Sequence, residues 1–277
     1  MKRSPLVGEL AAEFLGTMIL ILFGVGVVAQ VVTTPDGSLG DHDSISWAWG
    51  LGVTLGIYTA ARLSGAHLNP AVTIALAAFK GLEWKKVAPC CAAQTLGAFT
   101  AAMIVRFVYA DLIKAVDPNL TKTQTIFSTL PGNGTPDTPV SITTTFFDQI
   151  VGTAILVFVV FALTTATNNP PLGNIGPLMV GLLVVGIGMA WGANAGYAIN
   201  PARDFGPRLA SWITGYETAW SVPQTGYPYW WVPIVAPIIG GLIGGALFKF
   251  AIEMHIPEDE STEDESTEDP VVSEPTT

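Results

Sequence analysis

Two stretches of this 277-residue sequence share an Asn-Pro-Ala motif: Ser64-Gly65-Ala66-His67-Leu68-Asn69-Pro70-Ala71-Val72-Thr73 and Gly196-Tyr197-Ala198-Ile199-Asn200-Pro201-Ala202-Arg203-Asp204-Phe205-Gly206-Pro207. Asn is a favoured N-cap and Pro is favoured at the first helical position, so each motif predicts the start of a helix. The apolar segments that follow, residues 70–79 and 201–212, would be helices of only about 15–18 Å. Each is therefore about half as long as a helix that crosses a bilayer.

Longer apolar segments surround these two short ones. Half of the residues are hydrophobic and only 12% are charged, whereas a soluble domain carries about 25% charged residues. Candidate spans of sufficient length lie at residues 6–32, 44–63, 87–109, 146–167, 177–193 and 231–254. The first is too long for the apolar part of a cleaved signal peptide. The sequence thus predicts an all-α, multi-pass membrane protein with six transmembrane helices and two half-helices.

The two halves of the chain repeat each other. With an offset of 131 residues, Gly50-Leu51-x-Val53 matches Gly181-Leu182-x-Val184. Closer to the start of each half the offset is 136, where Gly16-Thr17-x-Ile19-Leu20 matches Gly152-Thr153-x-Ile155-Leu156. We expect one channel-like domain over residues 1–256, with repeats at about 6–110 and 143–254. Because each repeat holds three spans, the two must be inverted about an axis in the membrane plane.

Inverted half-helices enter the membrane from opposite sides and meet with their N-termini near the midplane. Irregular backbone at that depth is tolerated only beside a water-filled cavity. We therefore expect the segments before each Asn to line a pore with their carbonyl groups, and both Asn amides to donate into it. The expected pore-wall residues are Gly65, Ala66, His67, Leu68, Ala198 and Ile199. Two positive helix ends at one point would oppose cations.

The distribution of charge predicts the orientation of the chain. With the N-terminus in the cytoplasm, the inner side would hold Lys2, Arg3, Lys80, Lys85, Lys86 and Lys249. The loop at residues 33–43 has no Lys or Arg. This asymmetry is typical of the positive-inside rule and predicts that both termini are cytoplasmic. A bacterial inner membrane is the expected location.

The net charge of −10 comes mostly from the end of the chain. Nine of the 22 acidic residues follow Pro257, and without them thirteen acids face twelve bases. A tandem Glu-Ser-Thr-Glu-Asp repeat occupies residues 260–269. Such a segment cannot bury apolar surface, so we expect residues 257–277 to be a disordered acidic tail in the cytoplasm. A regulatory or partner-binding role is the alternative to simple solvation.

The motifs quoted above, together with Ala12-Glu13-Phe14-Leu15-Gly16-Thr17, resemble the major intrinsic protein family, the aquaporins and glycerol facilitators. The resemblance covers about residues 7–251. It implies six tilted helices and two half-helices around one pore per subunit, assembled as a homotetramer, with protons excluded by the opposed half-helix dipoles, as is known for this family. It implies no cofactor, no metal and no nucleic-acid partner. Cys90 and Cys91 are adjacent and show no metal-ligand spacing.

The same resemblance assigns the positions that choose the solute. The outer constriction would consist of Trp49, Gly188, Tyr197 and Arg203. Water-selective members usually have His at the position of Gly188, so Gly188 and Asp204 favour the glycerol facilitator subgroup. Aromatic rings on one side and a guanidinium on the other would suit a linear polyol. Tyr197 departs from the pattern, which often has Phe there, and leaves the relative rates of water and glycerol open.

Glu13 matches a buried carboxylate that in this family accepts hydrogen bonds from the pore loop. Its counterpart in the second repeat is Gln149, and Asp204 is expected to orient a loop. A proton-relay role for Glu13 is the alternative, although the second repeat lacks a carboxylate.

The sequence therefore predicts a passive channel for glycerol, other small neutral solutes and water that excludes ions and protons. Dihydroxyacetone, urea, lactic acid and hydrogen peroxide are of suitable size. A water-selective channel and a secondary active transporter remain as alternatives, since inverted repeats with broken helices occur in transporters as well. No nucleophile–base pair or metal cluster is apparent in the sequence, so an enzyme is not expected.

Overall fold

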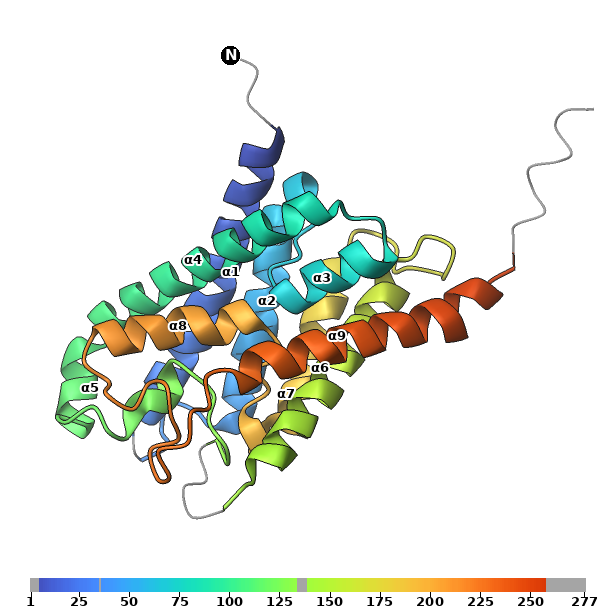
Figure 1. Ribbon diagram of the computed structural model, residues 1–277. Helices are drawn as coiled ribbons and strands as arrows, with labels where there is room; N and C mark the ends of the chain where they lie inside the picture. Colours follow the sequence, from blue (N-terminus) through green and yellow to red (C-terminus); the bar gives the residue numbers. More distant parts are fainter. Residues whose placement is uncertain (1–4, 35, 134–138, 258–277) are drawn as a thin grey trace, which may run out of the picture.

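The computed structural model describes residues 5–34, 36–133 and 139–257. These residues form an all-helical bundle (Figure 1). The long helices are α1 (Pro5–Val32), α2 (His42–Ser64), α4 (Trp84–Val108), α6 (Ile142–Thr164), α7 (Gly176–Ala195) and α9 (Val232–Ala251). The short helices are α3 (Pro70–Phe79), α5 (Ala110–Val116) and α8 (Pro201–Ile213), with 3-10 turns η1 (Thr123–Ile126) and η2 (Glu253–His255). The predicted architecture of six long helices and two half-helices is confirmed, whereas α5 and η1 were not predicted.

Five of the long helices are long and apolar enough to cross a membrane: α1, α4, α6, α7 and α9 with its η2 extension. The sixth, α2, has 23 residues and a comparable length. It is more polar because His42 and Asp43 lie in its first turn and Arg62 in its last.

The half-helices begin where the Asn-Pro-Ala motifs predict. Asn69 has extended backbone angles (φ −157°, ψ 120°), and its side chain accepts a hydrogen bond from the Ala71 amide. Asn200 (φ −154°, ψ 109°) accepts from Ala202 and Arg203 in the same way. Each Asn is therefore an N-cap, and the following Pro occupies a position that needs no amide hydrogen. In Figure 1, α3 and α8 lie end to end with their N-termini toward the middle of the bundle.

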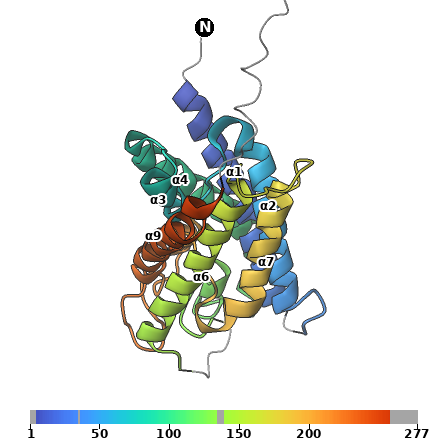
Figure 2. The same ribbon diagram turned by 90° about the vertical axis from the view of Figure 1, so that its right-hand side faces the viewer.

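Each half-helix packs against a long helix of the other repeat. In the first repeat α3 packs against α9 of the second, and α8 of the second packs against α4 of the first. The repeats also meet where α2 crosses α7 (Figure 2). At this crossing a Cβ atom on Gly50 would lie 2.5 Å from the Gly181 carbonyl, and a Cβ on Gly181 would lie 2.5 Å from the Gly50 carbonyl. These two glycines correspond in the repeat, so the pseudo-two-fold axis passes between them.

Ion pairs join the start of α1 and the end of α9 to the same end of the bundle. Lys86 contacts Glu9 at 3.0 Å, and Lys80 contacts Glu253 at 2.6 Å. The Lys80 ammonium also lies 5.1 Å from the ring centroids of Phe161 and Phe248, a distance typical of cation–π contacts. Apart from Pro257, the predicted acidic tail falls outside the described residues.

Candidate functional site

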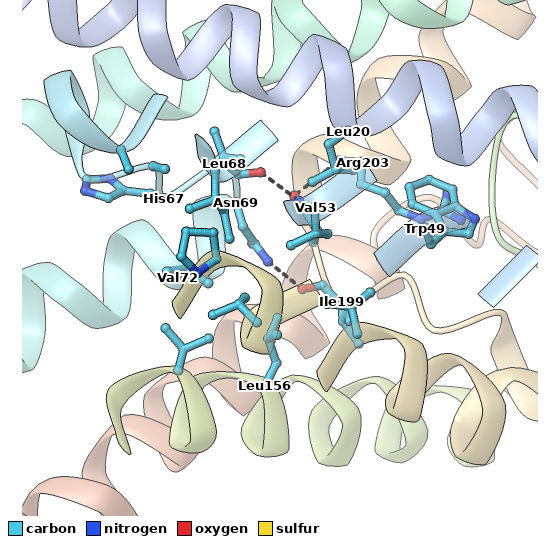
Figure 3. Close-up of a pocket in the computed structure, with 18 of the residues that line it drawn as sticks. Leu20, Trp49, Val53, His67, Leu68, Asn69, Val72, Leu156, Ile199 and Arg203 are labelled. Atoms are coloured by element: carbon cyan, nitrogen blue, oxygen red, sulfur yellow. Dashed lines mark hydrogen bonds between the residues drawn. The ribbon is translucent and has the colours of Figure 1, made fainter. Parts of the chain in front are cut away.

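An elongated cavity of about 320 Å³ occupies the centre of the bundle. The cavity extends along α7, because its lining includes Gly176 at the start of this helix and Tyr197 just beyond its end. All six predicted pore-wall residues line it, namely Gly65, Ala66, His67, Leu68, Ala198 and Ile199. In Figure 3, His67 lies at one end, Trp49 and Arg203 lie at the other, and Asn69 lies between them.

The two loops that lead into the half-helices have the same unusual backbone. Relative to each capping Asn, the residues at positions −4, −3 and −1 have positive φ. In the first loop these are Gly65 (84°), Ala66 (54°) and Leu68 (51°), and in the second Gly196 (68°), Tyr197 (35°) and Ile199 (43°). Non-glycine residues rarely adopt this region, and such strain concentrates at functional sites. The repeated pattern places both loops in the wall of the cavity.

The capping residues also connect the two loops. The Asn69 side-chain amide donates to the Ile199 carbonyl at 2.8 Å, and the Asn200 amide donates to the Leu68 carbonyl at 2.8 Å (Figure 3). An amide NH₂ has two donors, and both Asn side chains line the cavity. One hydrogen of each amide therefore joins the loops, and the other, which has no partner within the described ranges, is available to a solute.

Glu13 supports the first loop from α1. Its carboxylate is buried and accepts hydrogen bonds from the amides of His67 (2.9 Å) and Leu68 (2.8 Å). Two further donors, Ser64 (2.5 Å) and Gln94 (2.7 Å), complete its shell. Sequence reasoning identified Glu13 but missed Ser64 and Gln94, which only the folded chain brings next to it.

Gln149 takes the corresponding place in the second repeat. Its side-chain oxygen accepts from the Ile199 amide at 2.9 Å, and its nitrogen donates to the Ala195 carbonyl at 3.3 Å. Gln can play both parts because its amide holds a donor and an acceptor. The two supports are thus equivalent in position but differ in charge.

Three of the predicted constriction residues meet at one end of the cavity. The Arg203 guanidinium lies 4.0 Å from the ring centroid of Trp49, a distance typical of a cation–π contact. Tyr197 lines the same end. The Arg203 guanidinium makes no hydrogen bond to the described part of the chain, so its donors are available to a molecule in the cavity.

The fourth predicted residue, Gly188, lies behind this end. It is not among the described residues that line the cavity. A Cβ atom at this position would come within 2.9 Å of the Tyr197 ring and of the Ser46 hydroxyl. The ring of Tyr197 therefore occupies the space that a side chain at residue 188 would need.

Asp204 follows Arg203 but points away from the cavity. It is fully buried, pairs with Arg208 at 2.8 Å, and accepts hydrogen bonds from the amide and hydroxyl of Thr129. Arg208 also donates to the carbonyls of Thr129 and Ala219. The pair fastens the loop before α6 to α8. Arg208 was missed, although a base four residues after Asp204, on the same helix face, was a signal.

The cavity is amphipathic along its length. Carbonyls and Asn amides of the two loops supply polar groups, and much of the remaining lining consists of aliphatic side chains, namely Leu20, Val53, Ile57, Val72, Leu156, Val160 and Val184. Among the described residues, no group of His, Cys, Asp and Glu could hold a metal ion. The arrangement can pass a small neutral molecule that offers hydroxyl groups on one side and carbon atoms on the other.

Comparisons with known proteins agree with this geometry. The profile of the family described as "Major intrinsic protein" matches residues 1–248. The chain is 44% identical over 246 residues to "Probable aquaglyceroporin-2" of Gibberella zeae, covering 86% of this chain and 70% of that protein. It is 39% identical over 262 residues to "Glycerol uptake facilitator protein" of Escherichia coli (strain K12), covering 93% and 92%.

A solved structure shares the fold. The aquaglyceroporin from Plasmodium falciparum superposes with a TM-score of 0.78 at 34% identity, covering 89% of this chain and 97% of that one. With a profile match over most of the chain, relatives near 40% identity and the inverted half-helices described above, the chain belongs to the major intrinsic protein family of multi-pass membrane channels, which are not enzymes.

Proposed function

We propose that this chain is a passive channel for glycerol and related small neutral solutes, that it also conducts water, and that it excludes ions and protons. Relatives named as aquaglyceroporin and glycerol uptake facilitator support the solute class. The observation that carries the proposal is the outer end of the cavity, where Trp49 and Tyr197 line the lumen together with Arg203. The guanidinium of Arg203 makes no hydrogen bond to the residues that the structure describes.

These groups suit a polyol because they separate polar from apolar contacts. A polyol that sheds water must replace its lost hydrogen bonds, and the guanidinium of Arg203 can donate to its hydroxyl oxygens. The rings of Trp49 and Tyr197 offer apolar surface to the carbon chain. Further along, the carbonyls of Ala66 and Ala198 and the amides of Asn69 and Asn200 continue the polar strip.

Ion exclusion follows from the electrostatics of the same cavity. The N-termini of α3 and α8 meet near Asn69 and Asn200, and each carries about half a positive charge. Arg203 adds a full positive charge at the constriction. A cation or a hydrated proton would meet these charges in a lining that consists mostly of apolar side chains, where screening by water is weak.

A water-selective channel is the closest alternative. Water-selective members of the family usually have His at the position of Gly188, so the glycine disfavours this alternative. A proton-coupled transporter is disfavoured by Glu13, because both of its oxygens already accept hydrogen bonds from the pore loop and its supports.

The proposal extends to the placement of the chain. Residues 1–256 form the channel unit, with both termini on the cytoplasmic side of an inner membrane. Lys80, Lys85, Lys86 and Lys249 gather at the end of the bundle where α1 begins, as the positive-inside rule requires. We further propose that four copies assemble, each with its own pore.

Flux into proteoliposomes tests the proposal. Stopped-flow light scattering with a glycerol gradient should show solute entry well above that of empty vesicles, while a sucrose gradient reports water permeability in the same preparation. Glycerol entry equal to that of empty vesicles would refute the polyol channel. Saturable accumulation that depends on an imposed proton gradient would instead establish a transporter.

A further inference from the structure

His42 bridges the two repeats at the outer end of the cavity. It occupies the first position of α2, and its Nε2 atom lies 2.9 Å from the carbonyl oxygen of Gly188 on α7. Its ring also meets that of Tyr197 edge-on, with a centroid distance of 6.4 Å and an interplanar angle of 88°. One side chain therefore contacts two of the four residues assigned to the constriction.

The carbonyl that His42 contacts lies where α7 loses its regularity. Trp191, three residues after Gly188, has non-helical angles (φ −124°, ψ 16°). The His42 ring packs against Gly192, where even a Cβ atom would overlap it. Helices kink where a side chain inserts into the ladder of backbone hydrogen bonds. The imidazole thus provides a partner for the Gly188 carbonyl at the kink.

The end of α7 in turn determines where Tyr197 lies. The Gly196 amide donates to the Gly192 carbonyl at 2.9 Å, and Tyr197 follows directly in a strained, positive-φ conformation. A shift of residues 188–192 would therefore move the Tyr197 ring. This gives His42 an influence on the lumen that its own exposed position does not reveal.

Ser46 acts from the same face of α2. Residues 42, 46 and 49 are spaced four and three apart, so His42, Ser46 and Trp49 are neighbours on one side of the helix. The fully buried Ser46 hydroxyl donates to the His42 carbonyl at 3.0 Å and would lie 2.9 Å from a Cβ on Gly188. The neighbouring Tyr197 hydroxyl has no hydrogen-bond partner among the described residues.

We propose that His42, with Ser46, is a positioning residue of the outer constriction that sets the largest solute the channel admits. The Nε2–H of the imidazole holds the Gly188 carbonyl, and the ring supports Tyr197 from the side opposite the lumen. This inference rests on the proposed function, because it concerns which solutes pass the same constriction. Without the imidazole, Tyr197 can tilt into the vacated space, and the gap between Tyr197 and Arg203 widens.

The test compares His42→Ala with His42→Gln, which keeps a side-chain donor near the Gly188 carbonyl. Fluxes of water, glycerol and the longer polyol ribitol are measured in proteoliposomes of equal channel content. In His42→Ala we expect the ribitol-to-glycerol ratio to rise by roughly tenfold, the discrimination that one methylene group of space typically provides. His42→Gln should restore a ratio close to that of the wild type. His255→Ala, at the opposite end of the bundle, is the matched control.

An unchanged ribitol-to-glycerol ratio in folded His42→Ala would overturn the proposal, as would a ratio in His42→Gln equal to that in His42→Ala. Ser46→Ala provides a second variant if His42→Ala does not fold, and an unchanged ratio in that variant would count equally against it. The wild-type measurement separates the two levels of inference. Absence of wild-type glycerol flux refutes the proposed function, whereas normal wild-type flux with unaltered variant ratios refutes only the role of His42.

Discussion

The side-chain amide of Asn69 donates a hydrogen bond to the carbonyl of Ile199, 130 residues away in the other repeat. Asn200 and Leu68 form the symmetry-related bond. Each Asn therefore caps its own half-helix with its oxygen and holds the opposite loop with its nitrogen. The motif is thus a cross-connection between the repeats as well as a helix start, which explains why the chain needs it twice.

Replacing Asn69 with Asp separates these two roles. Asp is as good an N-cap as Asn, so α3 should still form, but the donor to Ile199 is lost and a negative charge appears where the helix ends meet. At an effective dielectric of about 20, one charge acting on another at 4 Å contributes about 4 kcal/mol. We expect proton conductance to rise by about tenfold or more.

A pH-sensitive dye inside proteoliposomes, with an imposed membrane potential, measures this conductance for Asn69→Asp. Asn168→Asp, in the turn after α6, serves as a control that adds the same charge outside the cavity. Proton conductance equal to that of the wild type would show that the converging helix ends do not provide the barrier.

Glu13→Ala should destabilise the channel strongly. The substitution leaves the amides of His67 and Leu68 and the side chains of Ser64 and Gln94 without their acceptor. Each unpaired buried group costs about 1–3 kcal/mol, so we expect a clear loss of thermal stability in detergent. Glu13→Gln keeps one acceptor oxygen, as Gln149 has in the other repeat, and should be less damaging.

Glu13→Gln also tests the proton-relay alternative. A structural carboxylate can be replaced by an amide while glycerol still enters proteoliposomes, and entry should remain independent of an imposed proton gradient. Complete loss of transport in a folded Glu13→Gln protein would favour the relay.

Much of this architecture could be predicted from local sequence. The half-helix α3 begins and ends at the predicted residues, and the long helices begin and end within a few residues of the predictions. Apolar length and N-cap chemistry are local signals, and the repeat offsets can be read directly by comparing the two halves of the sequence, so these features were sufficient. Each repeat has an odd number of spans, so the repeats must be inverted. The inversion in turn predicts that the two Asn-Pro-Ala motifs approach each other.

The parts that escaped prediction depend on contacts between distant segments. The loop between α4 and α6 folds into α5 and η1 and is fastened by Thr129 to Asp204 and Arg208, more than 70 residues away. No periodic pattern in the sequence of the loop predicts these short helices or their contacts with α8. Likewise, the contact of His42 with Gly188 requires α2 and α7 to cross, and the sequence of α2 alone suggests only an exposed first turn.

Gly188→Ala should narrow the constriction through Tyr197. The added methyl group would lie 2.9 Å from the ring and from the Ser46 hydroxyl, so the ring must move toward Arg203. Because a displaced ring obstructs glycerol more than the smaller water molecule, we expect glycerol flux to fall by about tenfold and water flux by a smaller factor. Gly188→His should reduce glycerol flux more strongly than Gly188→Ala does, and again more than it reduces water flux.

Gly186→Ala is the matched control for Gly188→Ala, since it lies on the same helix and a Cβ atom there would meet nothing within 4 Å. Paired glycerol and water measurements by stopped-flow light scattering distinguish the outcomes. An equal loss of both fluxes in Gly188→Ala would argue against a slot whose width selects the solute.

Tyr197→Phe tests the group that most distinguishes this constriction. The Tyr197 hydroxyl is buried and has no hydrogen-bond partner in the described part of the chain, and an unpaired buried polar group costs about 1–3 kcal/mol. Removing it should raise thermal stability, whereas Tyr58→Phe, which loses a 2.8 Å bond to the Asn174 carbonyl, should lower it.

The ring of Tyr197 rather than its hydroxyl should determine solute passage, because the oxygen lies against Gly188 and Ser46 and not in the lumen. Glycerol flux through Tyr197→Phe should therefore stay within about twofold of the wild type, which corresponds to about 0.4 kcal/mol in the barrier. A marked change in the ratio of glycerol to water flux would mean that the hydroxyl turns toward the solute. In that case Tyr197 would act as a polar ligand opposite Arg203, and the apolar corner of the slot would consist of Trp49 alone.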